Sequence, residues 1–373
     1  MKVFLLTIQD FWNYGNRLQN FALVKLLEEK GIEVDTGLTV FNKKDWENEK
    51  ANFIKRIIKR IVPYSIYKKR KLVLVKSLFD KSNKRKEAFM KFTLSYSTIS
   101  EPIICKNTKK FKEVFNYNAY DYFIVGSDQV WNPRIAGNQY MFLTFVPKHK
   151  RLSFAASIGV DKIDMDNYKR YKKNFYDMKY ISVREESAAR LIKSISGREA
   201  DVTLDPTLLL DKDIWVKTAK NPSFNLPEKF ICAYFLGEEP IAVQNISNKT
   251  GIPVIRLNDA TNEEVYSIGP EAFIYIIMKS ELVLTDSFHA VAFSVKFNKD
   301  FYVFEREQKN MNNMFSRISD ILTKFNLLSR ICNRDCDALL PSISEEIWNK
   351  VNIFLKDEKE RSISKLLLAM SEK

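Results

Sequence analysis

The stretch Glu281-Leu-Val-Leu-Thr-Asp-Ser-Phe-His-Ala290 decides the fold class of this 373-residue chain. Its apolar run, residues 282–284, is typical of a buried strand. The polar residues 285–287 then break the pattern before a helix-like stretch at 288–297. In open α/β sheets, ligands bind at the carboxyl ends of strands that lead into helices. We therefore expect a parallel sheet here, with a ligand site at its edge.

One of the two histidines, His289, lies at the start of that predicted helix. A helix N-terminus offers free N–H groups and positive potential to an anion. Histidine is the side chain whose ordinary pKa suits proton transfer near neutral pH. The sequence thus predicts an acid or base at a ligand site. The alternative is that His289 only caps or packs. His149, in the charged turn 147–151, is expected to be solvated.

Strand-like and helix-like segments alternate twice along the chain, which predicts two parallel-sheet domains facing across a cleft. We place the first domain at residues 1–208 and the second at 209–373, with a polar linker at 210–229 and a C-terminal helix in the last ~30 residues. The expected strands are 2–8, 32–40, 120–125, 151–157 and 179–183, then 230–236, 253–257, 282–284 and 301–304.

Composition indicates packed cores rather than disorder, since 45% of the residues are hydrophobic and 27 are Phe. No stretch of about 18 uncharged apolar residues is present, so we expect no membrane span. The apolar run at the N-terminus is too short for a signal peptide. The cysteines are Cys105, Cys232, Cys332 and Cys336, which complete no zinc set. A reduced cytosolic protein is the simplest interpretation.

The net charge of +14 is concentrated in one segment, because residues 51–91 alone carry +12. Isoleucines and a phenylalanine form an apolar stripe at 53–61, with basic residues between them. We interpret the region from about 45 to 92 as a basic helical insertion in the first domain. Such a helix suits an anionic membrane surface. It suits equally a solvated insertion whose stripe packs on its own domain. Nucleic acid ranks lower, because no recognised binding motif accompanies the charge.

Four segments, in this order and spacing, resemble the polysaccharide pyruvyl transferases, over roughly residues 1–330. They are Asn13-Tyr-Gly-Asn-Arg-Leu-Gln-Asn20, Gly126-Ser-Asp-Gln-Val-Trp-Asn132, Ser182-Val-Arg-Glu-Glu-Ser187 with Asp205-Pro206, and Thr285-Asp-Ser-Phe-His289. One departure is Ala290, where many relatives carry Gly. The resemblance implies a glycosyltransferase B-like fold of two Rossmann-like domains. It also implies transfer of the enolpyruvyl unit of phosphoenolpyruvate onto a sugar, closing a ketal.

That chemistry needs an acid or base, and cations for about three negative charges on the donor. The motif histidine of the family falls on His289, and Ser287 precedes it. Arg184 follows a predicted strand and is our first cation, catalytic and donor-binding, because Arg grips phosphate or carboxylate with two bonds. Its alternative role is an ion pair with Glu185 or Asp205. The second cation is Arg306, Lys309 (at a spacing similar to the family's basic residue) or Arg317, and surface solvation is the alternative for each.

The acceptor sugar is expected to meet the first domain, at its first strand-to-helix turn and at the sharp turn after the strand 120–125. The candidates are Asn13, Asn16, Arg17, Ser127, Asp128 and Trp131. Trp131 is a candidate to stack on a sugar face, and a capped core turn is its alternative. Arg17 has the alternative of covering its own helix. No second acid suited to a divalent metal lies near His289 apart from Asp286, so no required metal or other cofactor is predicted.

Three functions fit the sequence. The first is a pyruvyl transferase acting on a cell-surface polysaccharide precursor, in the cytoplasm or at the inner face of the membrane. A lipid-linked oligosaccharide acceptor would account for the basic helix. The second is a glycosyltransferase with a nucleotide-sugar donor on the same fold, since fold does not fix chemistry. The third is a non-catalytic sugar- or membrane-binding scaffold, in which His289 would be dispensable.

Overall fold

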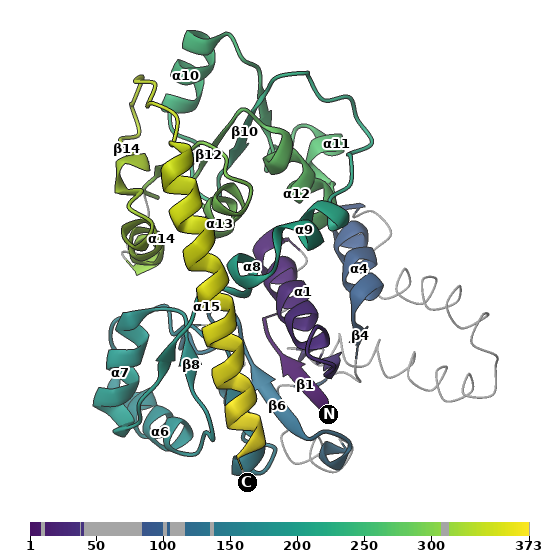
Figure 1. Cartoon of the computed structure of the whole chain (residues 1–373), viewed down its shortest axis with the longest axis vertical. Helices are drawn as coiled ribbons and strands as arrows, with labels where there is room; N and C mark the ends of the chain where they lie inside the picture. Colours follow the sequence, from purple (N-terminus) through teal and green to yellow (C-terminus); the bar gives the residue numbers. More distant parts are fainter. Residues whose placement is uncertain are drawn as a thin grey trace, which may run out of the picture.

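A computed structural model describes residues 1–8, 12–37, 39–40, 84–99, 103–104, 116–134, 138–306 and 313–372. Within this part of the chain, two parallel five-stranded sheets are each flanked by helices and lie one above the other in Figure 1. This is the predicted α/β class with two Rossmann-like domains. None of the described helices is long and apolar enough to cross a membrane.

The first sheet has the strand order β4-β2-β1-β6-β7, and all its pairs are parallel. Its strands are β1 (Lys2–Leu6), β2 (Glu33–Thr36), β4 (Thr98–Ile99), β6 (Tyr122–Val125) and β7 (Arg151–Ser153). Two short ladders accompany it, β3 (Thr39–Val40) with β5 (Ile103–Ile104), and β8 (Ser182–Val183) with β9 (Asp201–Val202). Single bridges join the β7 region to the β8 region, so the sheet edge continues toward Arg184.

The second sheet has the order β11-β10-β12-β13-β14 and is also wholly parallel. Its strands are β10 (Ile231–Tyr234), β11 (Val254–Arg256), β12 (Leu282–Thr285), β13 (Phe301–Phe304) and β14 (Ile331–Cys332). The strand before His289, β12, is central, and Leu284 pairs with Ala233 on one side and Tyr302 on the other. A central strand buried on both faces reads as a continuous apolar run, which is why the sequence revealed it.

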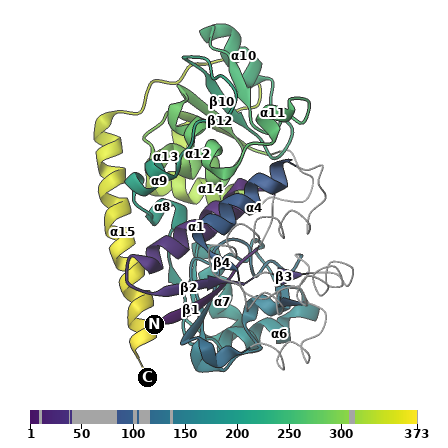
Figure 2. The ribbon, with the colours of Figure 1, turned by 90° about the vertical axis from the view of Figure 1, so that its right-hand side faces the viewer.

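The helices lie on the faces of the two sheets and between them (Figures 1 and 2). They are α1 (Tyr14–Glu28), α4 (Lys84–Tyr96), α6 (Met165–Tyr176), α7 (Glu186–Ser196), α8 (Pro206–Leu209), α9 (Lys212–Thr218), α10 (Ala242–Thr250), α11 (Glu263–Tyr266), α12 (Pro270–Lys279), α13 (Phe288–Lys296), α14 (Asn313–Lys324) and α15 (Glu345–Ser371). Short 3-10 helices are η2 (Tyr117–Ala119), η3 (Asn138–Phe142), η4 (Lys148–Lys150) and η5 (Leu328–Arg330).

The segment predicted as a linker is instead packed structure at its start. Residues 212–218 form α9, whose Trp215 is fully buried. The Trp215 ring contacts Phe21 of α1 and Phe293 of α13, so it joins helices that belong to different sheets. The prediction of a linker was wrong at 212–218. The residues around Trp215 are mostly polar, so the segment looked solvent-exposed, although the Trp215 ring is buried. The predicted boundary at 208/209 falls inside α8.

The C-terminal helix α15 does more than complete the second domain. It runs from beside the second domain, at the level of α13, along one side of the molecule and ends beside the first sheet (Figures 1 and 2). Tyr122 of β6 donates a hydrogen bond to the Met370 carbonyl at 2.5 Å. Arg361 donates to the Val202 carbonyl at 2.7 Å, and Lys365 pairs with Asp201. The helix therefore ties the second domain back to the first.

The predicted basic insertion lies mostly outside the described residues, which resume at Lys84. There α4 begins, and it extends to Tyr96 rather than ending near 92. Arg85 of α4 is buried and donates to the carbonyls of Trp12 at 2.7 Å and Tyr266 at 2.8 Å. Its guanidinium also lies over the Tyr14 ring at 4.6 Å. Thus the helix at the end of the basic segment is anchored to both domains.

Candidate functional site

His289 lies in the first turn of α13, directly after the carboxyl end of β12. The Thr285 hydroxyl accepts a hydrogen bond from the Ser287 amide at 3.0 Å, which holds the turn that starts the helix. His289 is 7% exposed. Its ring packs against Gly15 of α1 so closely that a Cβ at Gly15 would lie 2.0 Å from Nδ1. Two helix N-termini, one from each domain, therefore meet at this imidazole.

Asp205 faces the other ring nitrogen of His289. Its Oδ2 lies 3.7 Å from Nε2, an ion-pair distance rather than a hydrogen bond. Asp205 is fully buried and caps α8, where it accepts hydrogen bonds from the Thr207 amide at 2.9 Å and hydroxyl at 2.6 Å. Burial raises the pKa of this carboxyl, but Arg184, His289 and Thr207 outweigh burial and hold the pKa well below its usual range. Asp205 is thus an anion at neutral pH.

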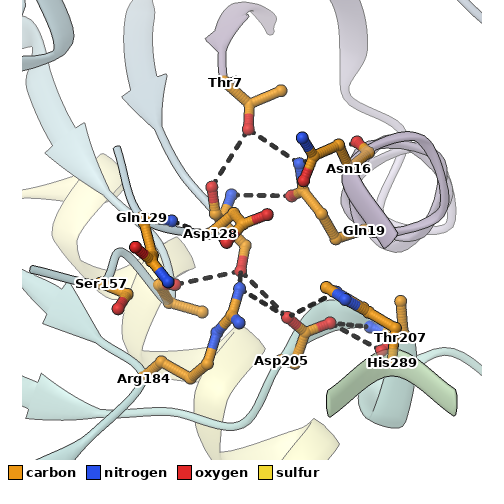
Figure 3. Close-up of polar contacts among 12 residues, drawn as sticks. Thr7, Asn16, Gln19, Asp128, Gln129, Ser157, Arg184, Asp205, Thr207 and His289 are labelled. Atoms are coloured by element: carbon orange, nitrogen blue, oxygen red, sulfur yellow. Dashed lines mark hydrogen bonds and ion pairs between the residues drawn. The ribbon is translucent and has the colours of Figure 1, made fainter. Parts of the chain in front are cut away.

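Arg184 follows β8 and pairs with that anion, as one of the two interpretations predicted. Its Nη2 lies 2.7 Å from Asp205 Oδ2 and donates to Ser127 Oγ at 2.6 Å (Figure 3). The guanidinium lies 5.0 Å from the centre of the Phe288 ring, a cation–π distance. Nε and Nη1 are buried and have no hydrogen-bond partner among the described residues. Of the three guanidinium nitrogens of Arg184, only Nη2 therefore has a polar partner among the described residues.

Ser127 is held by hydrogen bonds to two other segments of the first domain. Its amide donates to Gln19 Oε1 at 2.9 Å, and its carbonyl accepts from the Thr7 hydroxyl at 3.1 Å. Gln19 also donates to Thr7 Oγ1 at 2.8 Å, which closes the network drawn in Figure 3. Gly126 precedes Ser127 at φ +126°, and a Cβ there would lie 2.2 Å from the Phe154 carbonyl oxygen. Only glycine permits this turn.

Arg306 follows β13 and is aimed by Asp286. The Asp286 carboxylate accepts hydrogen bonds from the amides of Leu236 and Gly237, both at 2.8 Å. Its Oδ2 also accepts from Arg306 Nε at 2.9 Å. A Cβ at Gly237 would lie 2.6 Å from Arg306 Cγ, so the loop after β10 must stay small here. Asp286 thus joins two strand ends and positions one cation.

Arg317 of α14 crosses to the first domain. It is 6% exposed, and in the amide orientation that turns the Gln129 oxygen toward it, Nη2 donates to that oxygen at 2.7 Å. Burial is the main cause that lowers its pKa, followed by the like charge of Arg184, while Glu185, Asp128 and Asp205 oppose the shift. Arg317 and Arg184 are therefore close enough to repel each other.

These groups surround a cavity of about 100 Å³ between the domains. Its walls are Asn13, Asp128, Gln129, Leu236, Asp286, Ser287, Phe288, His289, Glu305, Arg306, Phe315, Arg317 and Ile318. The cavity combines one imidazole and two guanidinium groups with the carboxylates of Asp128, Asp286 and Glu305 and with other hydrogen-bonding side chains. Chemically, such a site suits a small anionic ligand that must gain or lose a proton.

The sequence candidates divide between the cavity wall and the layers behind it. Asn13, Asp128, Ser287, His289, Arg306 and Arg317 line the cavity, whereas Lys309 lies outside the described residues. Ser127 is fully buried behind the wall, and Asn16 is buried in α1 away from it. His149 is exposed, as expected.

Two acceptor candidates are corrected by the structure. Trp131 is fully buried, donates to the Met141 carbonyl at 2.9 Å and stacks on Phe142, so its ring cannot meet a sugar. Arg17 is fully buried and donates to the Ile8 carbonyl at 2.7 Å, so it braces the end of β1 instead of covering a surface or lining the cavity. Both positions resemble site residues in sequence because each follows a buried strand closely.

Gln19, Gln129 and Ser157 were missed as members of the site. Gln19 and Gln129 lie in segments that resemble the family, 13–20 and 126–132. Their amide side chains, however, carry no charge or reactivity that would single them out. Ser157 ends the β7 region and donates to Glu185 Oε1 at 2.5 Å. Within the described part of the chain, no group of three or more His, Cys, Asp or Glu residues is placed to hold a metal ion.

Comparison with known proteins places this site in a family. A sequence model described as polysaccharide pyruvyl transferase matches residues 13–308, which is more than three-quarters of the chain. This range contains every wall residue up to Arg306. No curated protein sequence matches the chain.

Solved structures support the fold alone. UDP-GlcNAc 2-epimerase from Methanocaldococcus jannaschii has 10% identity and a TM-score of 0.51, covering 99% of this chain and 100% of its own. A putative UDP-N-acetylglucosamine 2-epimerase from Listeria monocytogenes has 13% identity and a TM-score of 0.47, covering 97% of each chain. The MnaA–UDP co-structure from S. aureus has 14% identity and a TM-score of 0.45, covering 100% and 98%. The fold of this chain is glycosyltransferase B-like.

Proposed function

Because the chain belongs to the polysaccharide pyruvyl transferase family, we propose that it moves the enolpyruvyl unit of phosphoenolpyruvate onto a sugar of a cell-surface polysaccharide precursor. The methylene carbon of the donor gains a proton and becomes a methyl group. One sugar hydroxyl adds to the neighbouring carbon, phosphate leaves, and a second hydroxyl closes the ketal. The two hydroxyl groups lose two protons. One accounts for the proton that the methylene carbon gains, and the other leaves with phosphate or solvent.

The observation that carries the proposal is the cavity that brings His289, Arg306 and Arg317 together between the two domains. A donor with a phosphate and a carboxylate requires cations on more than one side. The two guanidinium groups come from the segment after β13 and from α14, so they approach the cavity from different elements. The imidazole is the group among the wall residues best suited to transfer a proton near neutral pH.

His289 is proposed as the acid or base, with Asp205 behind it. The buried carboxylate favours one orientation of the ring, as carboxylates do for catalytic histidines in other enzymes. Arg184 keeps Asp205 ionised and offers Nε and Nη1 to the donor. The proposed donor contacts are therefore Arg184, Ser287, His289 and Arg306. Arg317 is proposed as the third cation, because it is buried and not solvated at the surface.

The acceptor is proposed to enter from the first-domain side, where Asn13 and Asp128 line the cavity. Asn13 caps α1 by accepting from the Gly15 amide at 3.0 Å, and Asp128 accepts from the Gln129 amide at 2.8 Å. Each side chain keeps hydrogen-bonding capacity for a sugar hydroxyl. We expect no required metal, because guanidinium groups can meet the charge of the donor.

A lipid-linked acceptor at the cytoplasmic face of the membrane remains part of the proposal. Its support is the basic segment at 51–91, most of which lies outside the described residues. The test is pelleting of the full chain with anionic and with neutral vesicles. Recovery with anionic vesicles alone is expected, and no recovery with either would remove the membrane from the proposal.

The function itself is tested by phosphate release from phosphoenolpyruvate, with galactose-, glucose- and mannose-type acceptors, free and lipid-linked. Release should need an acceptor and should fall about 100-fold or more in His289→Ala. The matched control is His149→Ala, which removes the other, exposed histidine and should leave the rate unchanged.

Direct binding separates the alternatives. If no acceptor supports release, binding of phosphoenolpyruvate sends the search back to the acceptors. Saturable binding of a nucleotide sugar, with none of phosphoenolpyruvate, would instead favour a glycosyltransferase. Equal rates for His289→Ala and wild type would contradict the proposed role of the histidine.

A further inference from the structure

A buried arginine outside the cavity, Arg85 of α4, holds backbone segments of both domains. The residue is 2% exposed. Its polar partners among the described residues are the carbonyls of Trp12 at 2.7 Å and Tyr266 at 2.8 Å, and the side-chain oxygen of Asn258 at 3.2 Å. The centres of the Tyr14 and Tyr266 rings lie 4.6 and 4.5 Å from the guanidinium carbon. Because the donors of a guanidinium form a rigid fork, these partners are fixed relative to one another.

On the side of the first domain, the bond to Trp12 fixes the start of the cavity wall. The Trp12 carbonyl belongs to the peptide that leads into Asn13, a residue of the main cavity. Asn13 caps α1 by accepting a hydrogen bond from the Gly15 amide at 3.0 Å. Gly15 in turn packs against the His289 ring. The position of Trp12 therefore sets where Asn13 and Gly15 lie relative to the imidazole.

On the side of the second domain, Asn258 extends the contact to a cation of the cavity. Its Nδ2 donates to the Phe235 carbonyl at 2.7 Å. That carbonyl belongs to the same peptide as the Leu236 amide, which donates to Asp286 Oδ1 at 2.8 Å. Asp286 accepts from Arg306 Nε through its other oxygen at 2.9 Å. A continuous series of hydrogen bonds therefore runs from α4 to Arg306.

We propose that Arg85 is a positioning residue, which holds both walls of the cavity at one spacing and, through Asn258, aims Arg306. Arg85 is not among the described residues that line the cavity, so it acts on a ligand only through the residues that it holds. A displacement of about 1 Å at a site can cost about 100-fold in rate, so a remote tether matters for catalysis. The inference rests on the proposed function for its effect on turnover, whereas the hydrogen-bond series is independent of the reaction.

Hydrogen–deuterium exchange of the full chain, without any ligand, tests the tethers directly. Arg85→Lys keeps the charge, but the lysine nitrogen ends at the place of the guanidinium carbon, one bond short of the partners. Asn258 then loses the contact that orients its amide, and the Leu236 amide should exchange at least about tenfold faster than in wild type. Arg190→Lys, the same change at an exposed position of α7, should not alter this exchange. Unchanged exchange in Arg85→Lys would overturn the proposal.

Asn258→Asp breaks the series at a single link. The carboxylate has the size of the amide and keeps an oxygen for Arg85, but it cannot donate to the Phe235 carbonyl. In phosphate release from phosphoenolpyruvate, the donor KM should rise at least about tenfold, because Arg306 is no longer aimed. The acceptor KM should stay within about twofold, because Trp12 remains held. A general loss of structure would not separate the two constants in this way.

Asn248→Asp, the same change at an exposed residue of α10, is the control and should match wild type in both constants. Arg85→Lys should raise both KM values, because it releases both walls. Equal changes of the two constants in Asn258→Asp, or no change, would contradict the proposal. If Arg85→Lys does not fold, Asn258→Asp replaces it in the exchange experiment, with faster exchange again expected at Leu236. A wild type that releases no phosphate with any acceptor contradicts the proposed function alone, and the exchange of the Leu236 amide then decides this inference.

Discussion

Gly15 decides how closely the first domain can approach His289. It lies in the first turn of α1, next to the cap residue Asn13. Any side chain at this position would collide with the imidazole ring, whose Nδ1 would be 2.0 Å from the new Cβ. The glycine is therefore required by contact between domains rather than by backbone conformation.

We expect Gly15→Ala to separate activity from stability. Alanine is the better helix former by about 1 kcal/mol, so the helix itself gains. The imidazole must shift, however, and proton transfer is sensitive to shifts of this size. Phosphate release should fall at least about tenfold, while the melting temperature changes by only a few degrees. Unchanged kcat/KM would show that His289 is not held by this contact.

Gly251→Ala is the matched control with the opposite result. Gly251 has φ +69°, and a Cβ there meets nothing within 4 Å. Alanine is strained in this left-handed conformation, which costs about 1 kcal/mol of stability. The site is untouched, so phosphate release should stay at the wild-type rate.

At the scale of elements, α13 carries a functional group at one end and a buried charge at the other. His289 lies in its first turn, and Lys296, 7% exposed, is its last residue. Burial lowers the pKa of Lys296 to about 8, although the nearby Asp211 opposes the shift. The charged form of Lys296 therefore weakens the folded state at neutral pH.

We expect Lys296→Met to stabilise the protein near pH 7, by on the order of 2–3 kcal/mol. The folded pKa, about 8, lies below the unfolded value of 10.5. Between these values the unfolded state binds more protons, so wild-type stability rises with pH. The advantage of the variant should thus be largest below about pH 8 and should shrink toward pH 10.

Urea unfolding at a series of pH values measures this difference. Lys173→Met on α6 makes the same change at an exposed position and should have an effect of less than about 0.5 kcal/mol at every pH. A Lys296→Met advantage that does not depend on pH would point to packing instead of charge.

At the scale of the whole molecule, the two domains share one apolar core. A single cluster of buried residues includes Val3 and Leu5 of the first sheet and Cys232 and Val283 of the second. Tyr14 of α1 stacks on Phe273 of α12 at 4.4 Å between ring centres. Lys359 of α15 adds ion pairs of 2.8 Å to both Glu29 and Asp211. Two domains joined by a continuous core should unfold together.

Scanning calorimetry should therefore show one transition, and Trp215→Ala should lower the free energy of unfolding by about 3–5 kcal/mol. The ring is fully buried between α1 and α13, so its removal weakens both domains. Trp12→Ala is the control, because Trp12 is 43% exposed and should cost far less. Two separate transitions in wild type would show that the domains fold independently.

Local signals made the strands and His289 predictable. β12 is an apolar run of strand length that ends in polar residues, and β13 coincides with its predicted bounds. Both are predictable because parallel strands that are buried on both faces consist almost entirely of apolar residues. The predicted cavity residues that flank these strand ends, Ser287, His289 and Arg306, were found for the same reason. Trp131 and Arg17 share that position, and only burial distinguishes them from residues of the wall.

Residues close together in the chain were enough to predict the two parallel sheets, the family and the proposed acid or base, His289. Which charges face one another depends on the folded chain. Asp205 meets Arg184 and His289 across three segments, and Arg317 crosses from α14 to Gln129. The roles of such groups depend on burial and on partners distant in sequence, and a chain has neither property until it is folded.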